Sequence, residues 1–146
     1  HLENLLNETW RRSPRIKRRL HGKSQNSIPF DLLKGDLDRP LVLRLIGVSR
    51  VRSRTLNRDY RAKDSATDVL SFTSSEQGVL GELILCFPLL REQAHQHGLQ
   101  FHEELAYMCL HGLLHLLGWD HEKSQLEARE MFLLQDTAFN KYRSRT

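Results

Sequence analysis

The stretch DVLSFTSSEQGVLGELILCFP, residues 68–88, decides the fold that this chain is predicted to adopt. Two apolar runs within it, "DVLSFTS" and "VLGELILCF", are separated only by the polar residues "SEQG". Apolar runs of this length bounded by turn residues indicate β-strands, and a short polar connection favours a hairpin. Pro88 then opens a helix at the position where its missing N–H costs least. The sequence therefore predicts a β-hairpin that continues directly into a helix.

Upstream of this hairpin, two further elements are expected. The run "LVLRLIGVS" (Leu41–Ser49) follows Pro40 and predicts a buried strand. The polar segment that comes next, Arg50–Arg61, predicts a short helix. Residues 1–40 give no clear pattern, because Pro14 and a polar stretch interrupt them.

Downstream, the pattern changes to helices. Gly98 ends the helix that begins at Pro88, and a second helix is expected from about Phe101 to Leu117. A third helix is expected from about Lys123 to Tyr142, and its buried face is predicted to contain Leu126, Leu133, Leu134 and Ala138. Because the strands come early and the helices late, we expect an α+β (α/β-like) domain, a small mixed β-sheet packed with helices.

The bulk composition fits one globular domain over residues 1–146. Of these residues 39% are apolar and 27% are charged, and no apolar window is long enough to span a membrane. The first ten residues lack the basic start and apolar core of a signal peptide, so we expect a cytoplasmic protein without a membrane partner. The two cysteines, Cys86 and Cys109, lie in apolar runs and are predicted to be buried, reduced thiols.

Basic residues are concentrated in the first part of the chain. Residues 1–63 hold 16 Lys and Arg against 6 Asp and Glu, whereas residues 64–146 hold 6 against 12. Such a distribution suits an anionic partner such as a polyphosphate backbone, and it equally suits a solvated, mobile basic arm. If the partner is RNA, the candidate contacts are Arg11, Arg12, Arg15, Lys17, Arg18, Arg19 and Lys63.

Three histidines within "HGLLHLLGWDH", residues 111–121, carry the clearest functional signal. His111 and His115 are four residues apart, so in a helix their imidazoles project from nearly the same face. Gly118 tolerates the positive φ that turns the chain sharply, and the turn brings His121 back towards them. Three neutral imidazoles leave a fourth position open, as catalytic zinc sites do. The spacing therefore predicts one Zn²⁺ per chain, held at the end of a core helix.

The same spacing occurs in metzincin peptidases, with one difference. Those enzymes carry a glutamate directly after the first histidine, as the general base. This chain has Gly112 at that position, and a glycine cannot accept a proton. A metzincin-like peptidase is therefore only an alternative hypothesis.

Taken together, several segments resemble the YbeY family of bacterial metal-dependent endoribonucleases. They are "HGLLHLLGWDH", "LNRDYRAKDSATDVLSF" and "LGELILC", supported by the linking "REQAHQHG" and the last helix. The resemblance runs from about Leu41 to Tyr142, and residues 1–40 lie outside it. It implies that His111, His115 and His121 bind zinc. It also implies cleavage of single-stranded RNA, a role in maturing the 3′ end of 16S ribosomal RNA and in ribosome quality control, and the ribosome or its assembly factors as partners.

The resemblance further implies a catalytic role for Arg61, which we count with His111 as the catalytic residues. Physically, a guanidinium grips phosphate oxygens with paired donors and stabilises developing negative charge. The alternative is that Arg61 forms a salt bridge with Asp59, Asp64 or another local acid. A non-catalytic, ribosome-associated zinc-binding module is the third hypothesis for the whole protein.

Other residues near these motifs have more structural interpretations. Asp64, Thr67 and Asp68 are expected to be mostly architectural, because Thr and Asp satisfy backbone N–H groups at turns and strand entries. Asp120 is either an acceptor that fixes the tautomer of an imidazole or a residue that shapes the turn after Gly118. Trp119 is expected to pack as an apolar wall near the metal. The three remaining histidines of the last two thirds, His95, His97 and His102, are expected at the surface.

Overall fold

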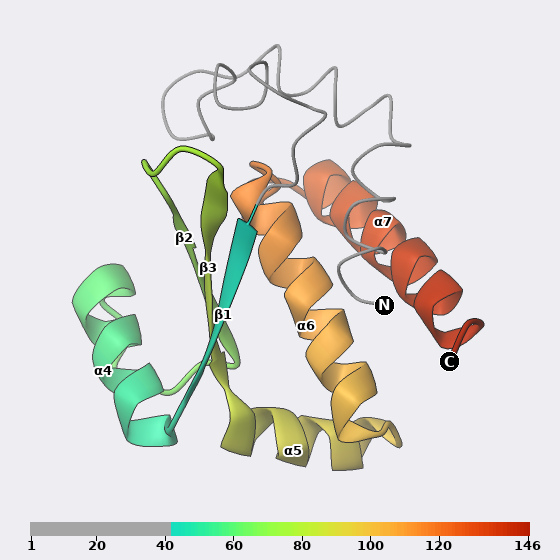
Figure 1. The fold of residues 1–146 in the computed structure, drawn as a ribbon, viewed down its shortest axis with the longest axis horizontal. Coiled ribbons are helices and arrows are strands. Elements are labelled where there is room, and N and C mark those ends of the chain that lie inside the picture. Colours follow the sequence, from blue (N-terminus) through green and yellow to red (C-terminus); the bar gives the residue numbers. More distant parts are fainter. Residues whose placement is uncertain (1–41) are drawn as a thin grey trace.

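The computed structural model describes residues 42–146 (Figure 1). The basic run from Arg11 to Arg19, and with it six of the candidate RNA contacts, lies outside the described residues. In chain order, the elements are β1 (Val42–Val48), α4 (Arg50–Arg61), β2 (Val69–Thr73), β3 (Val79–Cys86), α5 (Phe87–His97), α6 (Phe101–Leu116) and α7 (Gln125–Arg143).

The three described strands form one mixed sheet in the order β1-β3-β2. Strand β2 pairs with β3 in the antiparallel direction, which confirms the predicted hairpin, and β1 pairs with β3 in the parallel direction. Ile84 in the central strand is opposite Ile46 on one side and Leu70 on the other. The predicted fold class, an α+β domain with a small mixed sheet, is therefore confirmed.

The predicted burial of the first strand is wrong. In β1 the side chains of Val42, Leu45 and Ile46 are 51%, 45% and 39% exposed. The reason is position, because β1 lies at an edge of the described sheet and pairs only with β3. The central strand β3 is the buried one, and Leu83 at its middle is fully enclosed.

Local signals account for the helix boundaries. The side chain of Ser49 accepts a hydrogen bond from the backbone N–H of Arg52 and so caps the start of α4. Pro88 lies in the first turn of α5, and Gly98 ends that helix in the left-handed conformation. In Figure 1, α4 lies on one side of the sheet and α6 on the other, with α7 packed outside α6.

The predicted buried face of the last helix is wrong in half of its members. Leu126 and Leu133 are 69% and 63% exposed, whereas Ala138 is buried as expected. The buried residues of α7 instead include two polar ones, Glu127 and Gln135, together with Met131, Ala138 and Phe139. The two polar side chains are buried because Gln135 hydrogen-bonds groups within α6 and Glu127 accepts from the backbone of the turn that follows α6, as described below.

Both cysteines are free and buried, as predicted. Burial raises the pKa of the Cys109 thiol to about 12, so this side chain behaves as a small apolar group. Within residues 42–146, the structure contains no helix with the length and apolar character that a membrane span requires.

Candidate metal centre

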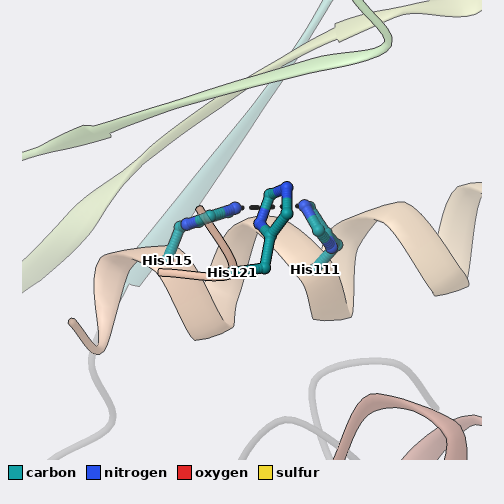
Figure 2. Close-up of side chains that lie close together, drawn as sticks. All are labelled: His111, His115 and His121. Carbon is teal, nitrogen blue, oxygen red and sulfur yellow. Dashed lines mark hydrogen bonds between the residues drawn. The ribbon is translucent and has the colours of Figure 1, made fainter. Parts of the chain in front are cut away.

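The three histidines of the motif meet at the C-terminal end of α6 (Figure 2). His111 and His115 lie one turn apart on α6, and the helix ends at Leu116. Gly118 has φ +89°, so the chain reverses and returns His121 to the same place. One ring nitrogen from each histidine lies within 4.8 Å of the other two. The predicted convergence of the three imidazoles is therefore present.

The outer nitrogens of two of these rings are fixed by hydrogen bonds. Nδ1 of His111 lies 3.0 Å from the amide oxygen of Gln135, and Nδ1 of His115 lies 2.9 Å from the carbonyl oxygen of Trp119. Both partners are acceptors, so each Nδ1 carries the proton and each Nε2 keeps its lone pair. The two Nε2 atoms lie only 3.1 Å apart. Two lone pairs at that distance repel each other unless a cation or a proton lies between them.

The third ring adds a buried nitrogen. Nδ1 of His121 is enclosed and has no hydrogen-bond partner among the described residues. A buried polar atom without a partner is uncommon and costs free energy. This orphaned atom, together with the two facing Nε2 atoms, indicates that the site is built for a ligand that accepts electron pairs.

Burial favours the neutral form of two of the rings, His111 and His115. Burial lowers the pKa of the His111 imidazole, and burial together with the neighbouring rings of His111 and His121 lowers the pKa of His115 to about 4. Metal binding requires the unprotonated imidazole, so little proton competition is expected at neutral pH. The donor set, one imidazole nitrogen from each of the three histidines within residues 42–146, fits a divalent metal ion.

Gly112, which takes the place of the peptidase glutamate, faces the sheet. A Cβ atom there would lie 2.6 Å from Cδ2 of Leu83 and 3.1 Å from Oγ of Ser71. The carbonyl oxygen of Gly112 also accepts a hydrogen bond from that hydroxyl. The position is therefore a close helix–sheet contact, and a glutamate in its place would point into the core.

Asp120 shapes the turn that carries His121. Its carboxylate accepts a hydrogen bond from the backbone N–H of Glu122 at 2.9 Å, and its own N–H donates to Glu127 at 3.1 Å. The imidazole acceptors are Gln135 and the carbonyl of Trp119, and neither was predicted from the sequence. The only sequence feature that could have indicated Gln135 is its spacing, because it lies four positions after Met131 and so on the same face of α7.

Asp68, at the entrance to β2, accepts three hydrogen bonds, two from its chain neighbours and one from α5. Oδ1 accepts from the backbone N–H of Val69 at 2.8 Å and from the hydroxyl of Thr67 at 3.3 Å. Oδ2 accepts from the side-chain amide of Gln93 at 3.1 Å. These contacts hold the loop before β2 in place, and Asp68 also lines the cleft described next.

An open cleft of about 780 Å³ is lined by the three histidines and by residues of the segment 57–72. Arg61 and Lys63, from the end of α4 and the loop that follows, line it. The acids expected near Arg61 are paired elsewhere, Asp59 with Arg58 and Asp64 with Arg54.

The carboxylate that Arg61 does contact is Glu122, the residue after His121. Its Oε1 lies 3.5 Å from Nη2 of Arg61 and 3.6 Å from Nζ of Lys63. Each of these side chains is at least 40% exposed, so the pairs are weak and open to exchange. The end of α4 and the loop after it therefore present two cations to the cleft beside the histidine cluster.

The other residues discussed from the sequence, Trp119 and three further histidines, lie outside the histidine cluster. Trp119 is 3% exposed within the main core cluster, so it packs and does not offer a free face. His95, His97 and His102 are exposed, as expected. His97 in addition contacts Glu104, whose side chain is almost fully buried, with 2.9 Å between Nδ1 and Oε2.

The protein is thus a small α+β protein with a candidate metal centre. Its histidine cluster lies at the end of a core helix and opens into a cleft with two cations. A family model described as Endoribonuclease YbeY matches residues 7–143. The chain belongs to the YbeY family. The match extends the resemblance from Leu41 back to residue 7.

Individual relatives agree with this assignment. Endoribonuclease YbeY of Bdellovibrio bacteriovorus is 52% identical over 97 residues, which are 66% of this chain and 65% of that protein. Endoribonuclease YbeY of Geobacillus thermodenitrificans is 42% identical over 108 residues, 65% of this chain and 69% of that protein. The chain thus spans slightly less than two thirds of the length of the Bdellovibrio relative.

A solved structure is also similar. The solution structure of TM1509 from Thermotoga maritima superposes with a TM-score of 0.51 and 29% sequence identity, and it covers 92% of this chain and 88% of that one.

Proposed function

We propose that this protein is a zinc-dependent endoribonuclease that cuts single-stranded RNA. The observation that carries the proposal is the convergence of three imidazoles in the same cleft as Arg61 and Lys63. The relatives named Endoribonuclease YbeY support the reaction class. An all-nitrogen donor set with a further open position favours zinc among the common divalent metals.

The residues of the chain have separable tasks in this reaction. His111, His115 and His121 would hold the metal, which when bound supplies Lewis-acid chemistry to a phosphoryl oxygen or to water. Arg61 binds the phosphate with paired N–H donors and stabilises the extra negative charge of the transition state. Lys63 adds a second positive charge that draws the RNA backbone into the cleft.

The biological setting is part of the same proposal. We place the protein in the cytoplasm, acting on ribosomal RNA at the 3′ end of the 16S species and in ribosome quality control, with the ribosome or its assembly factors as partners. The basic segment from Arg11 to Arg19 would add sequence-independent affinity for the RNA backbone.

The two alternatives are disfavoured by specific contacts. A peptidase of metzincin type needs a carboxylate after His111, and Gly112 instead packs against Leu83. A purely structural zinc site has four protein ligands, whereas the cluster within residues 42–146 has three members.

Cleavage of a single-stranded RNA from the 3′ end of 16S ribosomal RNA tests the proposal. We compare the zinc-loaded wild type with His115→Ala and Arg61→Ala, and use His102→Ala and Arg52→Ala as matched controls on the same two helices. Both control residues are exposed and lie outside the cleft.

We expect cleavage by the wild type and both controls, and a loss of at least about a hundredfold in kcat for both site variants, the size of effect seen when one transition-state donor is removed. Equal cleavage by all five proteins would come from a contaminating nuclease and would refute the proposal.

A further inference from the structure

Two exposed aromatic side chains line the cleft beside the charged groups. Tyr60 lies at the end of α4, directly before Arg61, and is 67% exposed. Phe132 lies on α7 and is 40% exposed. Both rings are thus exposed in the wall of the cleft that contains the histidines and the two cations.

Each ring is held in place by another ring. Tyr60 meets Phe72 of β2 edge-on, with 4.9 Å between ring centroids and 70° between the ring planes. Phe132 is stacked on His111, with 6.3 Å between centroids and an interplanar angle of 28°, and lies 5.7 Å from the ring of His121. Both rings are therefore oriented in advance and still exposed to solvent.

Charged and aromatic side chains lie together in this cleft. Tyr60 is next to Arg61, and Phe132 is next to the histidine cluster, while α4 and α7 lie on opposite sides of the sheet (Figure 1). Sites that bind single-stranded nucleic acid combine such cations, which follow the backbone, with rings on which the bases stack. An acidic ligand without aromatic rings would match only the two cations, and a neutral apolar ligand would match only the two rings.

We propose that Tyr60 and Phe132 each stack a nucleobase of the RNA, on the two sides of the phosphate held between Arg61 and the metal centre. This inference rests on the proposed function, and it explains why the enzyme would prefer single-stranded RNA to a duplex. In a duplex, neighbouring bases stack on each other and are paired, so their faces are not available to the two rings. Stacking does not read base identity, so the two subsites tolerate any sequence.

The test compares intact RNA with RNA that lacks a base. A 2′-O-methyl RNA oligonucleotide and two copies with an abasic nucleotide on one side or the other of the central phosphate are titrated with zinc-loaded protein by fluorescence anisotropy. The variants are Tyr60→Ala and Phe132→Ala, with Tyr60→Phe and Phe132→Tyr as substitutions that keep a ring. Val51→Ala on α4 and Leu133→Ala on α7 are matched controls, because both side chains are exposed and outside the cleft.

We expect each alanine substitution to weaken binding of the intact RNA about tenfold, near the lower end of the range for base–aromatic stacking. Each alanine substitution should change the affinity for the RNA that lacks its partner base by less than about twofold. The ring-keeping variants and the two controls should bind like the wild type. An equal loss on intact and abasic RNA, or no loss on either, would overturn the inference.

Cleavage of the unmodified RNA separates the two proposals. If the wild type cuts the RNA and the rings do not affect binding, the stacking inference fails and the proposed function stands. If the rings control binding but the wild type does not cut, the nuclease function fails and the stacking site stands.

Discussion

Gln135 is predicted to control metal affinity through His111, although it does not belong to the cluster itself. Its side chain is fully buried. The amide oxygen accepts from Nδ1 of His111 at 3.0 Å, and the amide nitrogen donates to the carbonyl of Tyr107 at 3.2 Å. Replacing Gln135 by leucine keeps the volume of the side chain and removes both hydrogen bonds.

The two lost hydrogen bonds have unequal consequences. Tyr107 lies within α6, so its carbonyl keeps the helical i to i+4 hydrogen bond and loses little. Nδ1–H of His111 would be left buried without an acceptor, which costs about 1–3 kcal/mol. The ring avoids part of this cost by moving its proton to Nε2, which then donates to Nε2 of His115 at 3.1 Å. That tautomer has no lone pair on the nitrogen that faces the cluster.

The expected result is therefore a larger loss in metal affinity than in stability. We expect Gln135→Leu to bind zinc about 10- to 100-fold more weakly, the range found when a hydrogen-bond partner of a ligating histidine is removed. The free energy of unfolding of the metal-free protein should fall by only about 1–2 kcal/mol. Zinc affinity is measured by competition with a chromophoric chelator, and stability by urea unfolding in the presence of a chelator.

Two further variants make the result specific. Gln135→Glu retains an acceptor for His111 and should keep zinc affinity at or above the wild-type value, while the buried carboxylate lowers the stability of the metal-free protein. Gln125→Leu, an exposed position on the same helix, should change neither quantity. If Gln135→Leu lost stability but bound zinc as tightly as the wild type, Gln135 would only be a packing residue and the argument about the tautomer would be refuted.

Two further predictions concern the helix–sheet contact and the carboxylate in the cleft. Gly112→Ala should lower the free energy of unfolding, measured by urea denaturation, by about 1 kcal/mol. The new Cβ would lie 2.6 Å from Cδ2 of Leu83, and this clash outweighs the gain in helix propensity. An increase in the free energy of unfolding would contradict the close approach of α6 to the sheet. Glu122→Gln should tighten RNA binding about two- to fivefold at low salt, because it removes the weak, exposed salt bridges of Glu122 with Arg61 and Lys63. Unchanged RNA affinity would show that Glu122 does not compete with phosphate for these two cations.

The histidine cluster was predictable because its geometry is local. Helix periodicity places His115 one turn from His111, and one glycine, Gly118, is enough to bring His121 back. All of this information lies within eleven consecutive residues, so no tertiary contact had to be inferred. The hairpin and the boundaries of α4 were predictable for the same reason, since turn residues and caps act over a few positions.

The groups around the cluster were not predictable, because tertiary packing places them there. Gln135 and Glu127 interrupt the apolar pattern of α7, so the pattern favoured Leu126 and Leu133 as buried residues. A polar residue becomes buried only if it finds partners, and the partners of Gln135 lie 24 and 28 positions away in the chain. Hydrophobic periodicity records burial of apolar groups and carries no information about such pairs.

The position of Gly112 connects the fold with the chemistry of the site. Helix α6 can approach the sheet closely only where this residue has no side chain, because Leu83 and Ser71 fill the space. The approach places one face of the helix, with His111 and His115, at the cleft, and it turns position 112 away from the cleft into the core. A carboxylate at that position would be buried and could not reach the substrate. The absence of a glutamate at this position therefore agrees with the close packing of α6 on the sheet. Arg61 and Lys63 are the cations that line the cleft together with the histidines, and in the proposed function they contact the RNA phosphate.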